Sequence, residues 1–347
     1  LKVGIVGASG TSGAVAARLV AAHPALELAV ATSDKLAGEG VAERLGLPGV
    51  PALRFTANAG ALDAAVACDA VLLATAADVS MKLAPALHAR GVRVVDLSGA
   101  FRLEAASYPR WYGFEHGAAS LLPAAHYGLP ELLGPPAPGA LVANPGCYPT
   151  AALLAIGPLV RAGLVDPATL VVDGKSGVTG AGRQTGDAYS FLEIDGDVRA
   201  YRVLGHQHAP EMARHLGRLL GAPPGPAAAV KLTFTAHLLP VARGLLATCY
   251  ARPRPGATAE RVAECLRDAY AGKAFVRAVA PGEARLARVV GTNLALVGAS
   301  ADDDMVVAVG AIDNLLKGAT GTALQNLNAL AGWDEALGLE ALQRFAA

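Results

Sequence analysis

Short apolar segments alternate with helix-like segments over the first 147 residues, and this alternation constrains the fold more than any other feature. The apolar segments are rich in Val, Leu and Ala. Such strands, separated by helices, are typical of a parallel sheet covered on both faces. We therefore predict a Rossmann-type α/β domain. Its predicted strands are residues 3–6, 26–32, 70–75, 92–97 and 140–143, and its predicted helices are 11–22, 79–90 and one from residue 150 onward.

The pattern changes after residue 147, where strand-like segments follow one another directly. They cover residues 169–174, 229–238, 244–251, 293–299 and 304–311, with helices at 209–220 and 258–271. This succession indicates an α+β domain with a largely antiparallel sheet. The last predicted helix, 314–330, is expected to pack back on the first domain. The predicted domains are therefore 1–146 with 314–347, and 147–313.

Charge and hydropathy argue against several classes of function. The chain has 29 basic and 29 acidic residues and no basic block, so we expect neither nucleic acid nor a membrane as partner. No stretch of 18 residues lacks Gly, Pro and charge, as a membrane span would. A strand starts at Lys2, which leaves no room for a signal peptide. Four cysteines without CxxC or metal-ligand spacing fit a reducing cytoplasm.

A glycine-rich loop joins the first strand to the first helix. Gly7 permits a tight turn, Gly10 lets the backbone approach a pyrophosphate, and Gly13 lets the helix pack close to the strand. The spacing is GxxGxxG, which also fits a plain strand–helix turn. We predict that the loop binds a dinucleotide, with Ser9, Thr11 and Ser12 between its glycines.

The end of the second strand bears on the choice between NAD and NADP. NAD sites usually place an acid here to hold the ribose 2′-hydroxyl. In this chain Ser33 and Lys35 can hold a 2′-phosphate, whereas Asp34 argues the other way. We expect NADP(H).

Cys147 stands among turn residues, directly after Asn144-Pro145-Gly146 and just before the predicted helix. Free N–H groups and the helix dipole favour an anion there, which lowers a thiol's pKa. The alternative is a small buried packing residue, which is how we interpret Cys68, Cys249 and Cys265. The motifs described next favour the interpretation of Cys147 as a nucleophile.

Six motifs follow one another along the chain and together are very specific. They are residues 127–132, 144–150, 174–183, 206–211, 234–240 and 312–318. With these motifs in this order, the chain resembles the N-acetyl-γ-glutamyl-phosphate reductase family over nearly its full length. This family is related to aspartate-semialdehyde dehydrogenase. The chain departs from the family's usual residues at Thr11, 76–78, 99–100 and Gln207, and none of these is the nucleophile.

The resemblance implies NADPH-dependent reduction of N-acetyl-γ-glutamyl phosphate to N-acetyl-L-glutamate 5-semialdehyde and phosphate, in arginine biosynthesis. Cys147 would form a thioester. The resemblance pairs His206 with Cys147 as the acid/base. It also implies that His208 and Glu211 lie close by, with His208 lining the substrate pocket. Asn144, with N–H groups of the helix, can hold the oxyanion.

The substrate's anionic groups need guanidinium and N–H donors. Arg102 and Arg183 lie inside matching motifs, although either can instead be a structural ion-pair partner. Ser176 and Gly177 belong to a stretch whose N–H groups can form a phosphate nest. The resemblance further implies cofactor contacts at Thr75, Ser98 and Asn314, and a homo-oligomer, dimer or tetramer.

Three alternatives remain open. One is a reductase of a carrier-protein-bound aminoadipyl or glutamyl phosphate in lysine biosynthesis, which would need a basic docking face. Another is an NADP-binding sensor without catalysis. The third is a zinc site at His206-Gln207-His208, which no second ligand cluster supports, so we expect no metal.

Overall fold

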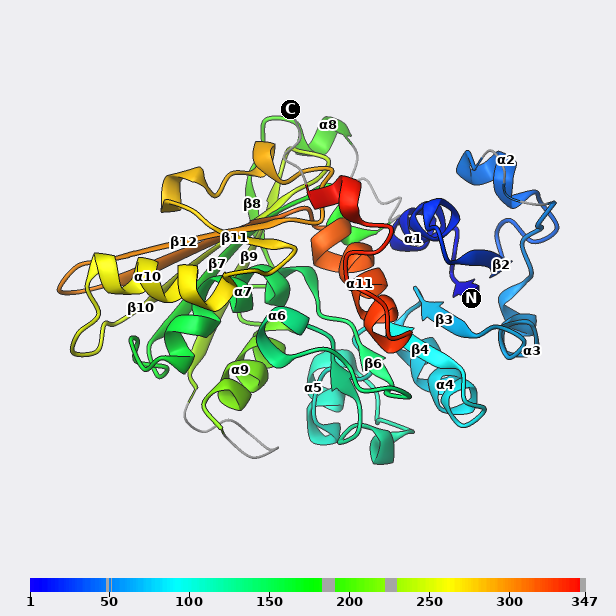
Figure 1. The fold of residues 1–347 in the computed structure, drawn as a ribbon, viewed down its shortest axis with the longest axis horizontal. Helices are drawn as coiled ribbons and strands as arrows, with labels where there is room; N and C mark the ends of the chain where they lie inside the picture. The colour runs from blue at the N-terminus through cyan, green and yellow to red at the C-terminus, as the bar shows by residue number, and fades with distance from the viewer. Residues whose placement is uncertain (48–49, 51, 183–190, 222–229, 344–347) are drawn as a thin grey trace. The chain divides into compact units, whose positions relative to one another are not determined.

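The computed structural model describes residues 1–47, 50, 52–182, 191–221 and 230–343, which form two compact units (Figure 1). Unit 1 comprises Leu1–Pro130, Gly134–Pro145 and Ala319–Ala341. Unit 2 comprises Glu131–Leu133, Gly146–Gly318 and the chain from Leu342. The last crossing of the chain into unit 1 thus comes at Ala319, later than the boundary at 314 expected from the sequence.

Unit 1 contains a six-stranded sheet in the order β2-β1-β3-β4-β6-β5, in which every pairing is parallel. The prediction of a parallel sheet is confirmed. The strands are β1 (Lys2–Val6), β2 (Glu27–Ala31), β3 (Ala70–Leu73), β4 (Arg93–Asp96), β5 (His126–Tyr127) and β6 (Val142–Ala143). The helices are α1 (Thr11–Ala22), α2 (Val41–Leu45), α3 (Ala61–Ala65), α4 (Ala77–His88), α5 (Tyr108–Tyr112) and α11 (Gly321–Leu330). Helix α6 (Pro130–Leu133) belongs to unit 2 from Glu131 on.

The central strands of this sheet are buried because their side chains are apolar on both faces. All four residues of β3 are buried, as a strand covered by helices on both sides requires. The last helix, α11, packs against α1 and β4, as expected from its apolar sequence.

Unit 2 contains a seven-stranded mixed sheet in the order β11-β12-β13-β10-β7-β9-β8. The pairs β11–β12 and β7–β9 are parallel, and the others are antiparallel, which confirms the largely antiparallel prediction. The strands are β7 (Leu170–Gly177), β8 (Arg199–Tyr201), β9 (Leu232–Leu239), β10 (Leu245–Ala251), β11 (Val276–Ala278), β12 (Ala295–Ala301) and β13 (Val306–Ile312). The helices are α7 (Cys147–Arg161), α8 (Phe191–Ile194), α9 (His208–Leu219) and α10 (Ala259–Tyr270).

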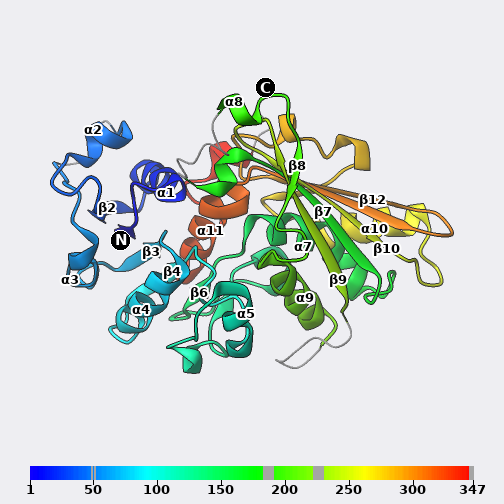
Figure 2. The same ribbon diagram turned by 180° about the vertical axis from the view of Figure 1, so that it is seen from behind.

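Helices α7 and α10 cover one face of this sheet. Helix α7 lies directly on β13: a Cβ at Gly310 would come within 2.4 Å of the carbonyl oxygen of Ala151. Burial alternates along β10, so its other side chains point to the opposite face. Seen from behind, in Figure 2, the strands lie in front of these helices.

Helix α7 begins at Cys147, three residues before the predicted start at Thr150. The apolar spacing from which the start was predicted begins only at Thr150, whereas the first turn also contains Pro149. Proline is tolerated in the first turn, where its missing N–H would have no intrahelical partner.

Two other features do not follow from apolar residues in the sequence. Strand β8 ends at Tyr201, and the apolar side chains of Val203 and Leu204 that follow it are 58% and 71% exposed. Helix α11 begins at Gly321, after a π-turn, η8 (Leu316–Thr320), that apolar periodicity does not distinguish from an α-helix.

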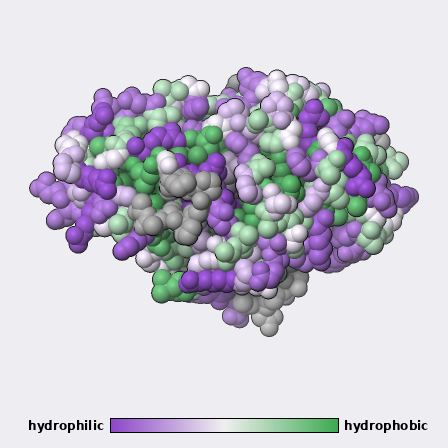
Figure 3. Space-filling view, turned by 90° about the horizontal axis from the view of Figure 1, so that it is seen from below, coloured by the Kyte–Doolittle hydropathy of each residue, from purple (hydrophilic) through white to green (hydrophobic). Residues whose placement is uncertain are grey.

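In the part of the chain that the structure describes, no helix has both the length and the apolar character that a bilayer crossing requires. Hydrophilic and apolar residues are interspersed over the face drawn in Figure 3.

Candidate active site

Cys147 is the first residue of α7, and the turn before it is held from two sides. The N–H of Gly146, the N-cap, donates to Oε1 of Glu211 at 2.9 Å. Its carbonyl accepts from the N–H and from the hydroxyl of Thr150, both at 2.9 Å. Glu211 is fully buried, so its carboxylate is a strong acceptor in a site with little competing water. Glu211 therefore positions the turn that presents Cys147.

The imidazole of His208 lies against the same turn. A Cβ at residue 146 would come within 2.4 Å of Nε2 of His208, so only glycine permits this approach. Cys147 itself is partly exposed, whereas His208 is buried. The structure thus brings Cys147, His208 and Glu211 together around this turn.

A cavity of about 280 Å³ opens beside Cys147 within unit 2. Its walls come from the nucleophile turn, the end of β7 and the segment between β8 and α9. The lining residues are Cys147, Tyr148, Ser176, Gly177, Gly180, Arg199, Tyr201, Arg202, His206, Gln207, His208 and Leu238.

His206 lies in this cavity wall as a neutral imidazole. Its Nδ1 accepts the backbone N–H of His208 at 3.1 Å, which leaves the ring proton on Nε2. Burial, and then the nearby His208 and Arg202, lower the pKa of His206 to about 2, although Glu211 opposes this. A typical imidazole titrates near pH 6.5, so His206 stays uncharged at physiological pH in this structure.

Aromatic rings form the wall behind the two histidines. Tyr148 packs edge-on to His206, His208 and Phe234, with ring centroids 5.7, 5.9 and 5.1 Å away. Its hydroxyl lies 3.1 Å from that of Tyr201, and burial raises the pKa of Tyr148 well above its ordinary value. Tyr148, His206 and His208 thus form an aromatic part of the cavity wall.

Two guanidinium groups that the sequence did not single out, those of Arg199 and Arg202, line the cavity. Nη1 of Arg202 donates to Oε1 of Gln207 at 2.7 Å. Arg202 has a φ of 47°, which is uncommon outside glycine. Among the described residues, no three His, Cys, Asp or Glu side chains gather as metal ligands.

The glycine loop of unit 1 has the steric properties of a phosphate-binding turn. Gly7 has a φ of +82°, and a Cβ there would lie 2.5 Å from the carbonyl oxygen of Ala74. A Cβ at Gly13 would lie 2.2 Å from the carbonyl oxygen of Gly7. A Cβ at Gly10 would lie 3.3 Å from the same oxygen, so Gly10 tolerates a side chain better than Gly13 does. The backbone is thus bare where α1 begins, as a dinucleotide site requires.

The end of β2 lies beside this loop. The hydroxyl of Ser33 donates to that of Ser9 at 2.7 Å. Both carboxylate oxygens of Asp34 accept hydrogen bonds from Asn58, at 2.7 and 2.9 Å. Lys35 is exposed. Ser33 therefore lies beside the glycine loop, and Asp34 is hydrogen-bonded to Asn58.

Comparison with known families agrees with both units. A model described as "semialdehyde dehydrogenase, NAD binding domain" matches residues 2–136, and one described as "semialdehyde dehydrogenase, dimerisation domain" matches residues 147–314. The chain belongs to the semialdehyde dehydrogenase family.

Curated relatives match this chain over nearly its full length. An N-acetyl-gamma-glutamyl-phosphate reductase of Magnetococcus marinus is 41% identical, covering 99% of both chains. Those of Moorella thermoacetica and Geobacillus stearothermophilus are 38% and 40% identical, covering 98% and 99% of both chains.

Solved structures share the fold at lower identity. Aspartate semialdehyde dehydrogenase II of Vibrio cholerae aligns with a TM-score of 0.69 at 18% identity, covering 95% of this chain and 98% of the other. The Candida albicans enzyme with NADP aligns with a TM-score of 0.64 at 17% identity, covering 98% and 99%.

Arg102 and Asn144 lie outside the cavity lining. Arg183 lies outside the described residues. Arg102 is buried in unit 1 and donates to the carbonyl oxygens of Asn144 and Leu97 at 2.8 and 2.7 Å. The amide nitrogen of Asn144 donates to the carbonyl oxygen of Ala319 at 3.0 Å.

The remaining predicted cofactor residues have protein partners. The hydroxyl of Thr75 lies 2.8 Å from that of Ser80, and the hydroxyl of Ser98 donates to Asp96 at 2.9 Å. Asn314 lies in unit 2, where its amide accepts from the N–H of Gly244 and donates to the hydroxyl of Thr179.

Proposed function

We propose that Cys147 forms the acyl-enzyme in the reduction of N-acetyl-γ-glutamyl phosphate to N-acetyl-L-glutamate 5-semialdehyde and phosphate, with NADPH as reductant. The overall reaction, a step of arginine biosynthesis, is that of the full-length relatives at about 40% identity. The observation that carries the mechanism is the position of Cys147, at the first residue of α7 and on the wall of the cavity.

In the first step the sulfur of Cys147 attacks the acyl carbon. The carbon–sulfur bond forms, the carbon–oxygen bond to phosphate breaks, and phosphate leaves with the electron pair. The developing oxyanion needs N–H donors. Pro149 has no N–H and that of Gly146 donates to Glu211, so neither of these two residues is the proposed N–H donor in the first turn of α7. Asn144 is the additional donor proposed from the sequence.

His206 is the proposed acid/base. In the free enzyme its depressed pKa makes it a poor proton acceptor. A phosphate dianion bound in the cavity would favour the imidazolium and raise this pKa. His206 would then take the proton of Cys147 when substrate is present, and return it when the hemithioacetal releases the aldehyde.

The substrate's carboxylate and phosphate match the cations of the cavity. Arg199 and Arg202 present guanidinium groups there, with Ser176 and Gly177 at the end of β7 and His208 beside the thiol. Guanidinium binds planar anions in a bidentate fashion. Arg102 and Arg183 remain the further proposed ligands.

NADP(H) would be held by the loop and strand ends of unit 1. The proposed contacts are Gly7, Ser9, Gly10, Thr11, Ser12, Gly13, Ser33, Lys35, Thr75 and Ser98, with Asn314 of unit 2. When bound, the cofactor supplies the hydride that reduces the acyl carbon. Ser33 beside the glycine loop and the exposed ammonium of Lys35 at the end of β2 support NADP over NAD, because both can hold a 2′-phosphate.

The family description of residues 147–314 as a dimerisation domain indicates a homo-oligomer. We propose a dimer or tetramer acting in the cytoplasm, where a catalytic thiol stays reduced.

A trapping experiment tests the proposed acyl-enzyme. The protein is mixed with N-acetyl-γ-glutamyl phosphate in the absence of reductant, quenched in acid and digested. Mass spectrometry should find the acyl group on the peptide containing Cys147, and its yield should fall after pretreatment with iodoacetamide. A modified peptide without Cys147 would contradict the proposal. A carrier-protein-bound aminoadipyl phosphate, offered in parallel, should leave no adduct.

A further inference from the structure

Two of the six motifs, residues 127–132 and 312–318, contribute no residue to the cavity lining, yet they meet inside unit 2. Lys317 donates its ammonium hydrogen to Oε1 of Glu131. The two side chains are 0% and 1% exposed. The ammonium also lies 5.6 Å from the ring centroid of Phe275. A buried charge is retained only when it is paired, so the two residues depend on each other.

Lys317 belongs to η8, a π-turn that reaches the nucleophile. The N–H of Gly318 donates to the carbonyl oxygen of Asp313 at 2.9 Å, five residues back, as in a π-turn. A Cβ at Gly318 would come within 2.9 Å of the Cβ of Cys147. The backbone next to Lys317 therefore packs on the side chain of Cys147, and a shift of this turn would move the thiol. Single π-turns within helices are frequent at functional sites.

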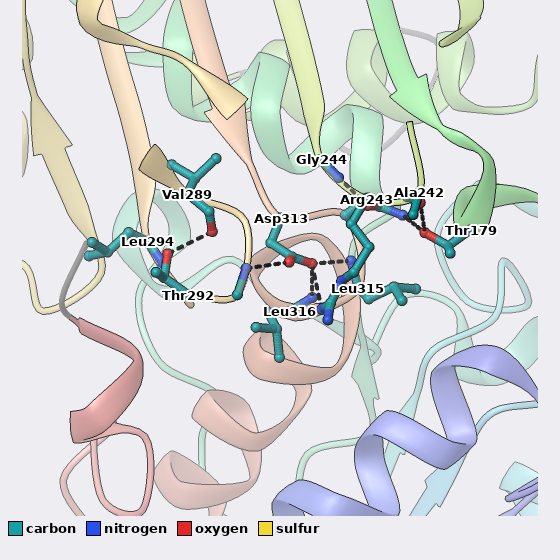
Figure 4. Close-up of polar contacts among 12 residues, drawn as sticks. Thr179, Ala242, Arg243, Gly244, Val289, Thr292, Leu294, Asp313, Leu315 and Leu316 are labelled. Carbon is teal, nitrogen blue, oxygen red and sulfur yellow. Dashed lines mark hydrogen bonds and ion pairs between the residues drawn. The ribbon is translucent and has the colours of Figure 1, made fainter. Parts of the chain in front are cut away.

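The other end of the segment has a second charged anchor (Figure 4). Asp313 is fully buried and accepts from Nη2 of Arg243 at 2.9 Å. It also accepts the N–H groups of Gly291, Leu315 and Leu316, at 2.8, 2.8 and 3.0 Å. Residues 313–318 are therefore held by a carboxylate at one end and by an ammonium at the other. Lys317 is the chain neighbour of Gly318, whereas Asp313 reaches Gly318 through its backbone carbonyl oxygen, at 2.9 Å.

We propose that Lys317, through its ion pair with Glu131, is a positioning residue that sets the orientation of the Cys147 thiol by fixing Gly318 against it. This inference rests on the proposed role of Cys147. An ion pair that served stability alone would not need to lie one residue from the contact with the nucleophile. Two buried apolar side chains would serve stability equally well.

The test compares Lys317→Met with the double variant Lys317→Met/Glu131→Leu. The single variant leaves Glu131 buried without its cation, whereas the double variant removes both charges. We expect Lys317→Met to lower kcat by about 10²-fold, the cost of a misplaced reacting group, with KM changed less than about threefold. The double variant should regain the wild-type Tm but not kcat. In both variants, the pH profile of Cys147 alkylation by iodoacetamide should differ from that of the wild type.

Tyr270→Phe is the matched control. Tyr270 is buried, and its hydroxyl donates to the carbonyl oxygen of Leu154 in the middle of α7, at 2.6 Å. This variant should lower Tm and leave kcat and the alkylation profile unchanged.

A double variant that regains wild-type kcat together with Tm would overturn the inference, as would a wild-type kcat in Lys317→Met. If Lys317→Met does not fold, the kcat, Tm and alkylation profile of the double variant alone test the inference. Failure of the proposed function is a separate result, since it appears as an acyl adduct that is not on Cys147.

Discussion

Helices α1 and α7 begin with nearly the same backbone turn, and we propose different chemistry for the two. Each follows a β-strand of unit 1 in the chain, and each has a glycine N-cap without a side-chain hydrogen bond. The backbone angles of these caps are almost equal: φ −68° and ψ 168° at Gly10, and φ −68° and ψ 156° at Gly146. The difference therefore lies in the side chains around each turn.

At α1, residues 11–13 all have an N–H, and Gly13 is so close to Gly7 that no side chain fits between them. At α7, Pro149 has no N–H, and Glu211 already holds that of Gly146. We interpret α1 as a broad cradle for a pyrophosphate, and α7 as a narrower oxyanion site with a thiol at its first position. One backbone turn can thus bind an anion or present a nucleophile, depending on which N–H groups remain available.

Replacing the thiol should produce the largest effect and separate the two turns. Cys147→Ser should lower turnover by about 10⁴-fold or more, because a hydroxyl is not ionised near neutral pH. NADP binding, measured by fluorescence titration, should be unchanged. More than a few per cent of wild-type turnover in this variant would show that Cys147 is not the nucleophile.

The two histidines of the α7 site should differ in their effects. His206→Asn should lower kcat by about 10²–10⁴-fold with little change in KM, the usual result of losing a general acid/base. His208→Asn should instead raise KM. Because burial lowers the pKa of His206 to about 2, kcat/KM, which reports the free enzyme, should show no ionisation of His206 at roughly pH 6–9. A turnover defect confined to His208→Asn would reverse the two roles.

Crowding the α1 turn should affect only the cofactor. Gly13→Ala places a Cβ 2.2 Å from the carbonyl oxygen of Gly7, whereas Gly10→Ala makes a contact of 3.3 Å. We expect Gly13→Ala to weaken NADP binding by about 10²-fold, or about 3 kcal/mol, and Gly10→Ala to weaken it less. The alkylation rate of Cys147 should stay at the wild-type value in both. Equal effects of the two variants would remove the steric argument.

Cofactor choice should depend on the end of β2. Replacing Ser33 and Lys35 by Ala should weaken NADP by about 1–3 kcal/mol, the worth of charge-assisted hydrogen bonds to a 2′-phosphate. NAD, which lacks this phosphate, should be affected much less. Titrations that show the same loss for both cofactors would contradict the assignment.

His206 should also make stability depend on pH. Its folded-state pKa lies below that of the unfolded chain, so the unfolded state binds the extra proton as pH falls. The contribution of His206 is therefore complete above about pH 6.5 and decreases by about 1.4 kcal/mol per pH unit below it. Urea unfolding of wild type and His206→Asn at several pH values measures it. Parallel curves for the two proteins between about pH 4 and 7 would contradict the predicted shift.

Sequence patterns predicted the parts of the molecule that depend on near neighbours. The bounds of α1 agree with the predicted helix at both ends, because apolar spacing and the closing His23-Pro24 act within a few residues. The start of α7 differs by three residues because the apolar spacing begins only at Thr150, whereas the helix already begins among the turn residues at Cys147. The exposure of Leu204 could not be predicted from its apolar side chain, because burial depends on which other elements cover it.

By itself, the sequence determined the two sheet types, the bare glycine turn and the cysteine among turn residues, because hydrophobic periodicity and glycine or proline geometry act locally. Only the tertiary structure decided which distant groups meet. It pairs Lys317 with Glu131 across 186 positions of sequence, places Gly146 against His208, and directs Arg199 and Arg202 to the cavity. The low pKa of His206 likewise comes from burial by distant elements. These contacts follow from how the strands and helices pack together, which local preferences do not specify.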